Sequence, residues 1–210
     1  MIALWYPILI IAVTGYMLGN LNGAVMISSL YAKEDVRKHG SGNAGLTNYI
    51  RNYGAGTGML VILIDGLKAI VACLVGKLIL PNDPLLGGTI GGFAVMLGHI
   101  FPAMLGFKGG KGILSGFCVA MSLDWRIGMT ILGMFLLFYL ATQYVSLGSV
   151  MGAVGFAIAF PFFHHDHIPV AVMGFLMGAL AVFMHRGNIV RLVKGRERKT
   201  NLFSKKGKQT

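Results

Sequence analysis

The chain has 210 residues, of which 55% are hydrophobic and only 12% are charged, and its mean hydropathy is +0.72. This composition excludes an ordinary soluble domain and indicates a polytopic membrane protein. The formal net charge of +11 does not indicate a nucleic-acid-binding protein, because the sequence contains no soluble domain to carry a binding face.

Seven apolar runs follow one another along the chain. They cover residues 3–31, 57–80, 85–105, 113–123, 127–145, 147–163 and 168–184. Several reach the ~20 residues that a helix needs to cross a bilayer, whereas the fourth run is short enough to be a half-helix or a segment packed among its neighbours. We therefore expect an all-α, polytopic membrane helical bundle of about seven transmembrane segments, with six as the alternative.

Lysines and arginines are distributed unevenly between the two sides of this predicted bundle. If the segments alternate, one side receives six of them in loops before residue 112 and nine between 186 and 208, which makes fifteen of the eighteen. The positive-inside rule then places the N-terminus outside and the C-terminus in the cytoplasm. This orientation needs an odd number of spans and favours seven. We expect residues 1–198 to form a single integral-membrane domain, and 199–210 a mobile, basic cytoplasmic tail.

The first of three polar clusters on the predicted cytoplasmic side covers residues 39–52. Arg51 can hold a phosphate through paired N–H donors, and smaller polar side chains can complete a cage around it. These side chains are Ser41, Asn43, Thr47 and Asn48. The structural alternative is a capped turn before the second span.

The second cluster, residues 98–112, reads GHIFPAMLGFKGGKG. Closely spaced glycines let backbone N–H groups form an anion-binding concavity, and lysines add positive charge. The candidate phosphate-binding residues are Lys108, Gly109, Gly110, Lys111 and Gly112. A basic turn that anchors two spans is the structural alternative. The pattern is not a Walker A motif, because the spacing of its glycines is too short and no Ser or Thr follows the last lysine, so we do not expect nucleotide hydrolysis.

The third cluster lies after the last apolar run, at residues 185–199. His185 and Asn188 are three positions apart and would share one face of a helix, where with Arg191 they could orient an acceptor hydroxyl and its charge. If this segment only anchored the last span on the cytoplasmic side, it would need its basic residues, but it would not need a histidine and an asparagine at this spacing.

Two pairs give weaker signals. Asp65 and Lys68 lie inside the second apolar run, where an unpaired charge is costly, and their i, i+3 spacing permits a mutual ion pair. Ser146 and Ser149 are weighed evenly between phosphate donors and structural residues.

The three clusters resemble the three motifs of the bacterial acyl-phosphate-dependent glycerol-3-phosphate acyltransferases of the inner membrane. The first motif matches Ser41-Gly42-Asn43-x-Gly45-x-Thr47-Asn48-x-x-Arg51. The second matches Gly98-His99-x-Phe101-Pro102 through Phe107-Lys108-Gly109-Gly110-Lys111-Gly112. The third matches His185-x-x-Asn188-Ile189-x-Arg191-Leu192-x-x-Gly195-x-Glu197-x-Lys199. The resemblance covers nearly the whole chain and makes residues 1–198 an acyltransferase domain.

The resemblance implies transfer of a fatty acyl group from acyl phosphate to the 1-hydroxyl of glycerol 3-phosphate, giving lysophosphatidate and phosphate. The protein would be a multi-pass protein of the inner (cytoplasmic) membrane with its active site on the cytoplasmic side. Acyl phosphate is already activated, so no metal, nucleotide or other cofactor is expected. The expected partners are the two substrates and membrane lipid, with the soluble or peripheral enzyme that makes acyl phosphate as a further candidate, and no nucleic acid.

Residue chemistry and resemblance together define the candidate site. The catalytic candidates are His185, Ser41 and Lys111. The substrate- and phosphate-binding candidates are Asn43, Thr47, Asn48, Arg51, Lys108, Gly109, Gly110, Gly112, Ser149, Asn188, Arg191 and Glu197. The sequence shows no nucleophile elbow, which favours direct attack over an acyl-enzyme.

Two questions stay open at this stage. The hydroxyl proton could pass to His185 or to the phosphate of the substrate, and we favour the phosphate because Arg186 and Arg191 would lower the pKa of the histidine. The competing function is a membrane transporter of a phosphorylated solute. The sequence disfavours it, because the polar clusters gather at one face instead of at the middle of the membrane in two repeated halves.

Overall fold

A computed structural model describes residues 5–199, and all regular secondary structure within this range is helical. The helices are α1 Trp5–Asn20, α2 Gly23–Ile27, α3 Leu46–Tyr53, α4 Ala55–Ile79, α5 Pro84–Ile100, α6 Ile113–Leu123, α7 Trp125–Thr142, α8 Val145–Phe163, α9 Ile168–Met184 and α10 Arg186–Val193. Short helical turns cover Ser28–Ala32, Val36–Lys38 and Ala103–Leu105. Most of the predicted basic tail, residues 200–210, lies outside the described residues.

Five stretches are long and apolar enough to cross a membrane: Trp5–Ala32, Ala55–Ile79, Pro84–Leu105, Trp125–Thr142 and Val145–Phe163. A sixth is α9 taken together with α10, which bends away from it by 53°. The apolar helix α6 has 11 residues and is shorter than these. The prediction of an all-helical, multi-pass membrane bundle is therefore confirmed, with five or six candidate spans in the part of the chain described here.

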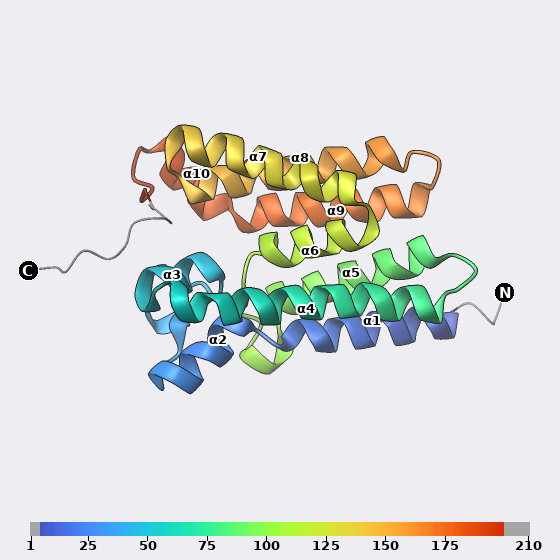
Figure 1. Cartoon of the computed structure of the whole chain (residues 1–210), viewed down its shortest axis with the longest axis horizontal. Helices are drawn as coiled ribbons and strands as arrows, with labels where there is room; N and C mark the ends of the chain where they lie inside the picture. The colour runs from blue at the N-terminus through green and yellow to red at the C-terminus, as the bar shows by residue number, and fades with distance from the viewer. Residues whose placement is uncertain (1–4, 200–210) are drawn as a thin grey trace, which may run out of the picture.

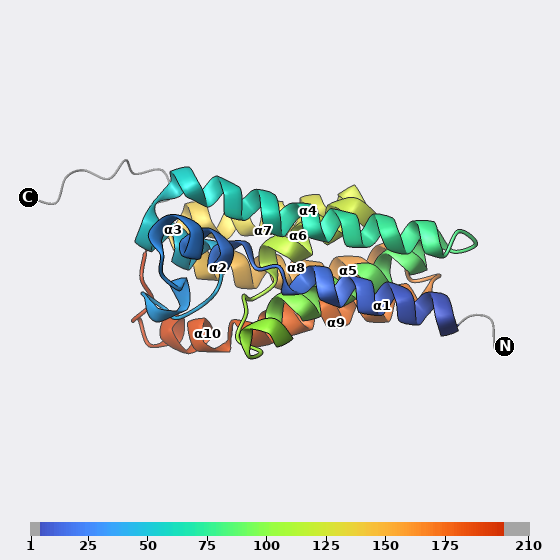
Figure 2. The same cartoon turned by 90° about the horizontal axis from the view of Figure 1, so that it is seen from below.

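The long helices run side by side in two groups (Figure 1). Helices α1, α4 and α5 form one group, and α7, α8 and α9 form the other. The short helix α6 lies between them and packs against members of both. Helices α3 and α10 gather at one end of the bundle, at the left in Figures 1 and 2, while the loops that join α4 to α5 and α8 to α9 lie at the opposite end.

Small residues let the helices of the first group approach one another closely. A Cβ added at Gly76 of α4 would lie only 2.0 Å from the carbonyl oxygen of Gly87 on α5, and one at Gly98 would lie 2.2 Å from the carbonyl oxygen of Tyr16 on α1. Contacts between backbones of this kind are typical of membrane helices, which gain little from the hydrophobic effect and associate through close packing. The close packing fixes α5, whose last residues lead into the glycine-rich loop.

Candidate functional site

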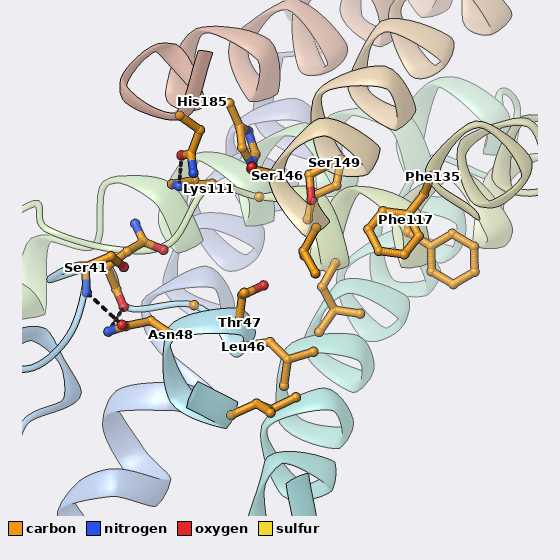
Figure 3. Close-up of a pocket in the computed structure, with 18 of the residues that line it drawn as sticks. Ser41, Leu46, Thr47, Asn48, Lys111, Phe117, Phe135, Ser146, Ser149 and His185 are labelled. Atoms are coloured by element: carbon orange, nitrogen blue, oxygen red, sulfur yellow. Dashed lines mark hydrogen bonds between the residues drawn. The ribbon is translucent and has the colours of Figure 1, made fainter. Parts of the chain in front are cut away.

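A cavity of about 350 Å³ lies where α3, α10 and the glycine-rich loop meet the bundle, and all three polar clusters contribute to its wall. Its polar lining consists of Ser41, Asn43, Thr47, Asn48, Arg51, Asp65, His99, Lys111, Ser146, Ser149, His185, Asn188, Arg191 and Glu197. In Figure 3, Ser41 and Thr47 lie across the cavity from Lys111 and His185, while Phe117 and Phe135 lie farther along it, beyond Ser149.

The apolar part of the wall comes from α3, α6, α7 and the start of α8. It consists of Leu46, Ile50, Ile113, Leu114, Phe117, Ile131, Leu132, Phe135 and Val145. The cavity therefore has a polar region and an adjoining apolar region, and a ligand that fills it must itself be amphipathic.

Three helices begin at the cavity. The residues that precede α3, α6 and α8 are Gly45, Gly112 and Tyr144, and none of them caps its helix with a side-chain hydrogen bond. The first residues of each helix line the cavity. Because the first N–H groups of a helix have no partner within it and carry a partial positive charge, these three ends together favour an anion.

Lys111 belongs to a chain of polar contacts that connects the glycine-rich loop to α10. Its Nζ donates a hydrogen bond to Oδ1 of Asn188, whose Nδ2 in turn lies 3.3 Å from Oε1 of Glu197. The other carboxylate oxygen accepts from Nε of Arg191 at 2.8 Å. Burial, followed by the positive charge of Arg191, lowers the pKa of Lys111 to about 8.

Glu197 lines the cavity, and each of its carboxylate oxygens accepts a hydrogen bond, one from Asn188 and one from Arg191. The carboxylate therefore positions these two partners at the wall, and its contact with the substrate stays a prediction.

His185 lies at the junction between α9 and α10 and is only 4% exposed. Its Nδ1 is 2.7 Å from the carbonyl oxygen of Ala181, so Nδ1 carries the proton and Nε2 is an acceptor. Arg186, which was predicted to lower the pKa of this histidine, lies over the ring of Phe183 at 4.4 Å.

Asn48 lies at the cavity wall and holds the loop that carries Ser41. Its Nδ2 donates to the carbonyl oxygens of Val36, His39 and Asn43 at 3.0–3.1 Å, and its Oδ1 accepts from the N–H of Ser41 at 2.9 Å. With all its hydrogen-bonding groups engaged and 3% of its surface exposed, Asn48 fixes the shape of the loop and has no donor left for a phosphate. Its contacts hold Ser41 at the wall of the cavity.

The glycine-rich loop contributes less than its sequence predicts. Lys108 is exposed and lies outside the cavity, in a separate shallow pocket that also includes Arg37. The N–H groups of Gly109 and Gly110 donate to backbone carbonyls at the end of α5, at 3.2 and 3.0 Å, so they do not form the predicted anion-binding concavity. Lys111 and Gly112 are the members of this set that line the cavity.

The remaining predicted residues reach the cavity wall. Asn43, Thr47, Arg51, Ser149, Asn188 and Arg191 all line it. Ser146, the other member of the serine pair with Ser149, lines the same wall, and its buried Oγ has no hydrogen-bond partner within residues 5–199. The only signal in the sequence was its i, i+3 spacing from Ser149 at the start of an apolar run. Asp65 and His99, which are outside the candidate set, line the cavity as well.

The chain matches known proteins over almost its whole length. The family profile described as Glycerol-3-phosphate acyltransferase matches residues 9–195. The glycerol-3-phosphate acyltransferase of Thermoanaerobacter pseudethanolicus is 37% identical over 188 residues, which cover 90% of this chain and 93% of the relative. That of Clostridioides difficile is 36% identical over 197 residues, which cover 92% of this chain and 96% of the relative.

Two crystal structures resemble the fold. Both are of PlsY (YgiH), an integral membrane glycerol 3-phosphate acyltransferase. The glycerol 3-phosphate form has a TM-score of 0.83 at 32% identity and covers 94% of this chain and 99% of that one. The lysophosphatidic acid form has a TM-score of 0.80 at 31% identity, with coverages of 93% and 96%. By its family match, its relatives and its fold, the chain belongs to the glycerol-3-phosphate acyltransferase family.

Proposed function

We propose that this chain, an acyltransferase by its family, transfers a fatty acyl group from acyl phosphate to the 1-hydroxyl of glycerol 3-phosphate. The products are lysophosphatidate and inorganic phosphate. The observation that carries this proposal is the division of one cavity into a polar region that favours anions and an adjoining apolar region. Glycerol 3-phosphate carries a phosphate, and acyl phosphate and lysophosphatidate each carry both a phosphate and an acyl chain. The cavity has one region suited to each of these two groups.

The polar region suits a phosphate because several sources of positive potential meet there. Lys111, Arg51 and Arg191 line it, together with the uncapped starts of three helices. A phosphate monoester carries about −1.5 to −2 charges at neutral pH. Charge-assisted hydrogen bonds from the lysine and the arginines would offset this charge, and the helix N-termini would add N–H donors.

The apolar region suits the acyl chain. Phe117, Phe135 and the aliphatic residues beside them form a continuous wall that starts next to the polar residues. Each methylene group of a chain that leaves water is stabilised by about 0.8 kcal/mol. The junction between the two regions is therefore where an acyl carbonyl would lie.

In the proposed reaction, the 1-hydroxyl oxygen of glycerol 3-phosphate forms a bond to the acyl carbon. The bond between that carbon and the bridging oxygen then breaks, and phosphate leaves with its electron pair. The proton goes to a phosphate of the substrates, whose second pKa of ~6 makes it a base at neutral pH. Nε2 of His185 is left as a hydrogen-bond acceptor that orients the hydroxyl.

We further propose that the chain crosses the inner membrane seven times, with the cavity on the cytoplasmic side. Within residues 5–199, twelve of the fifteen lysines and arginines lie in α3, in α10 or in the segments 33–38, 108–111 and 194–199, and the other three are Lys68, Lys77 and Arg126. Helix α6 supports seven crossings, because it continues from the glycine-rich loop toward the opposite end of the bundle (Figure 1). A soluble or peripheral enzyme that makes acyl phosphate would meet the protein at the basic end.

The test is the reaction itself. Purified protein in lipid, given acyl phosphate and glycerol 3-phosphate without added metal or nucleotide, should form lysophosphatidate and phosphate in equal amounts. Omission of either substrate should abolish lysophosphatidate. Uptake of glycerol 3-phosphate into sealed vesicles with no lysophosphatidate formed would instead identify a transporter and would contradict the proposal.

A further inference from the structure

Beneath the glycine-rich loop, three ionisable side chains from two helices form a buried cluster that the proposed reaction does not use. Asp65 and Lys68 on α4 and His99 on α5 are each at most 5% exposed. Nζ of Lys68 lies 2.7 Å from Oδ1 of Asp65 and 3.0 Å from Nδ1 of His99. Charged groups inside a membrane bundle are costly unless paired, and they are a default indication of function.

Part of this cluster has a structural explanation. Lys68 also donates to the carbonyl oxygens of Gly19 and Leu21, where α1 ends, and Asp65 accepts from the N–H of Gly23, where α2 begins. The ion pair therefore satisfies backbone groups left unpaired by the break between the two helices. This explains the aspartate and the lysine, but it does not need the histidine.

The contacts of Lys68 fix the protonation of His99. An ammonium group is a donor only, so the Nδ1 that faces it at 3.0 Å must be the acceptor. The proton of the neutral ring is then on Nε2. Asp65 does not compete for Nδ1, because its Oδ1 is 3.6 Å away.

Gly110 packs against the imidazole ring. A Cβ added to this glycine would lie 2.1 Å from Nε2, so a larger residue at this position would displace the ring. His99 lines the cavity, and within residues 5–199 no hydrogen bond to Nε2 is present. A histidine that is 4% exposed thus presents a donor, in a fixed tautomer, to the same cavity that Lys111 lines.

We propose that His99 is a further substrate-binding residue whose Nε2–H donates a hydrogen bond to a phosphate oxygen of the bound substrate. Asp65 and Lys68 act as positioning residues that hold the ring in this tautomer. The inference rests on the proposed function, because it takes the ligand of the cavity to be a phosphate compound. A neutral donor adds directional binding without a further positive charge next to Lys111.

Kinetics in lipid test the contact. His99→Ala should raise KM for one of the two phosphate substrates about tenfold or more, as expected for a hydrogen bond to a charged group, and the substrate affected identifies which phosphate is bound. His99→Gln, whose amide N–H reaches a similar position, should stay within a few-fold of wild type. His165→Ala is the matched control, because His165 is exposed at the opposite end of the bundle. Unchanged KM values for both substrates in folded His99→Ala would overturn the proposal.

A spectroscopic measurement separates this proposal from the proposed function. In protein labelled with ¹⁵N-histidine, the signal absent from His99→Gln should show a proton on Nε2, and it should shift when glycerol 3-phosphate or inorganic phosphate is added. Lys68→Met should abolish the fixed tautomer. A proton on Nδ1, or a signal that neither ligand shifts, would overturn the assignment. This titration needs no turnover, so it is informative even if wild-type protein forms no lysophosphatidate.

Discussion

Replacement of Lys111 by alanine removes the lysine that lines the polar region of the cavity and leaves Lys108, three residues earlier, in place. The loss should fall on phosphate binding. A hydrogen bond to a charged group contributes about 1.5–3 kcal/mol, and every 1.4 kcal/mol is a factor of ten. We therefore expect kcat/KM for glycerol 3-phosphate to fall by roughly 10- to 150-fold.

A second contact of Lys111 affects the size of this loss in kcat/KM. Lys111 donates to Oδ1 of Asn188, so the alanine variant loses a support of that amide as well as a substrate contact, and the loss should lie toward the upper end. Lys111→Arg keeps the charge and should retain more activity than Lys111→Ala. Lys108→Ala is the matched control and should stay within about twofold, since surface substitutions away from special features have small effects.

The assay is initial-rate formation of lysophosphatidate in lipid, with the amount of folded protein measured by size-exclusion chromatography. An equal loss in Lys108→Ala and Lys111→Ala would show that the loop acts through its overall charge. Near-normal activity in folded Lys111→Ala would refute the assignment of this lysine to phosphate binding.

Three further outcomes follow from the same geometry. His185→Asn should mainly raise KM for glycerol 3-phosphate and keep the pH profile, whereas a normal KM with kcat lowered by ~10²–10⁴-fold would identify the histidine as the general base. Because the pKa of Lys111 is lowered to about 8, its ammonium loses the proton above that pH, so kcat/KM should decrease there, and Lys111→Arg should remove the decrease. In a background without native cysteines, an impermeant thiol reagent outside cells should label Asn82→Cys and not Lys194→Cys, and the reverse labelling would invert the proposed orientation.

The helical bundle and the convergence of its polar clusters could both be predicted from the sequence, because a membrane restricts the structures that a chain can form. Apolar runs of sufficient length become helices, since every backbone group must be paired inside the bilayer. Residues as distant as Arg51, Lys111 and Asn188 then converge, because alternate crossings bring their segments to the same end of the bundle.

The roles of single residues within those clusters were harder to predict. Lys108 and Lys111 look equivalent in sequence, but the conformation of the loop turns one of them out of the cavity. Asn48 and Glu197 have the chemistry of site residues, yet their polar atoms are used by neighbouring loop and helix groups. Such assignments depend on which partners the tertiary structure brings within hydrogen-bond distance, and residue type alone does not specify this.

His99 illustrates the same limit. Its contact with Lys68, which lies 31 positions earlier on another helix, cannot be read from proximity in the sequence.

The proposed reaction joins the 1-hydroxyl oxygen of glycerol 3-phosphate to the acyl carbon of acyl phosphate and leaves the phosphorus untouched. Glycerol 3-phosphate labelled with ¹⁸O at its 1-hydroxyl tests this in one measurement, by mass spectrometry of both products. Attack at the acyl carbon predicts that the label stays entirely in the ester of lysophosphatidate and that the released phosphate carries none. Unlabelled lysophosphatidate, or ¹⁸O in a phosphoryl product formed by attack at phosphorus, would contradict it.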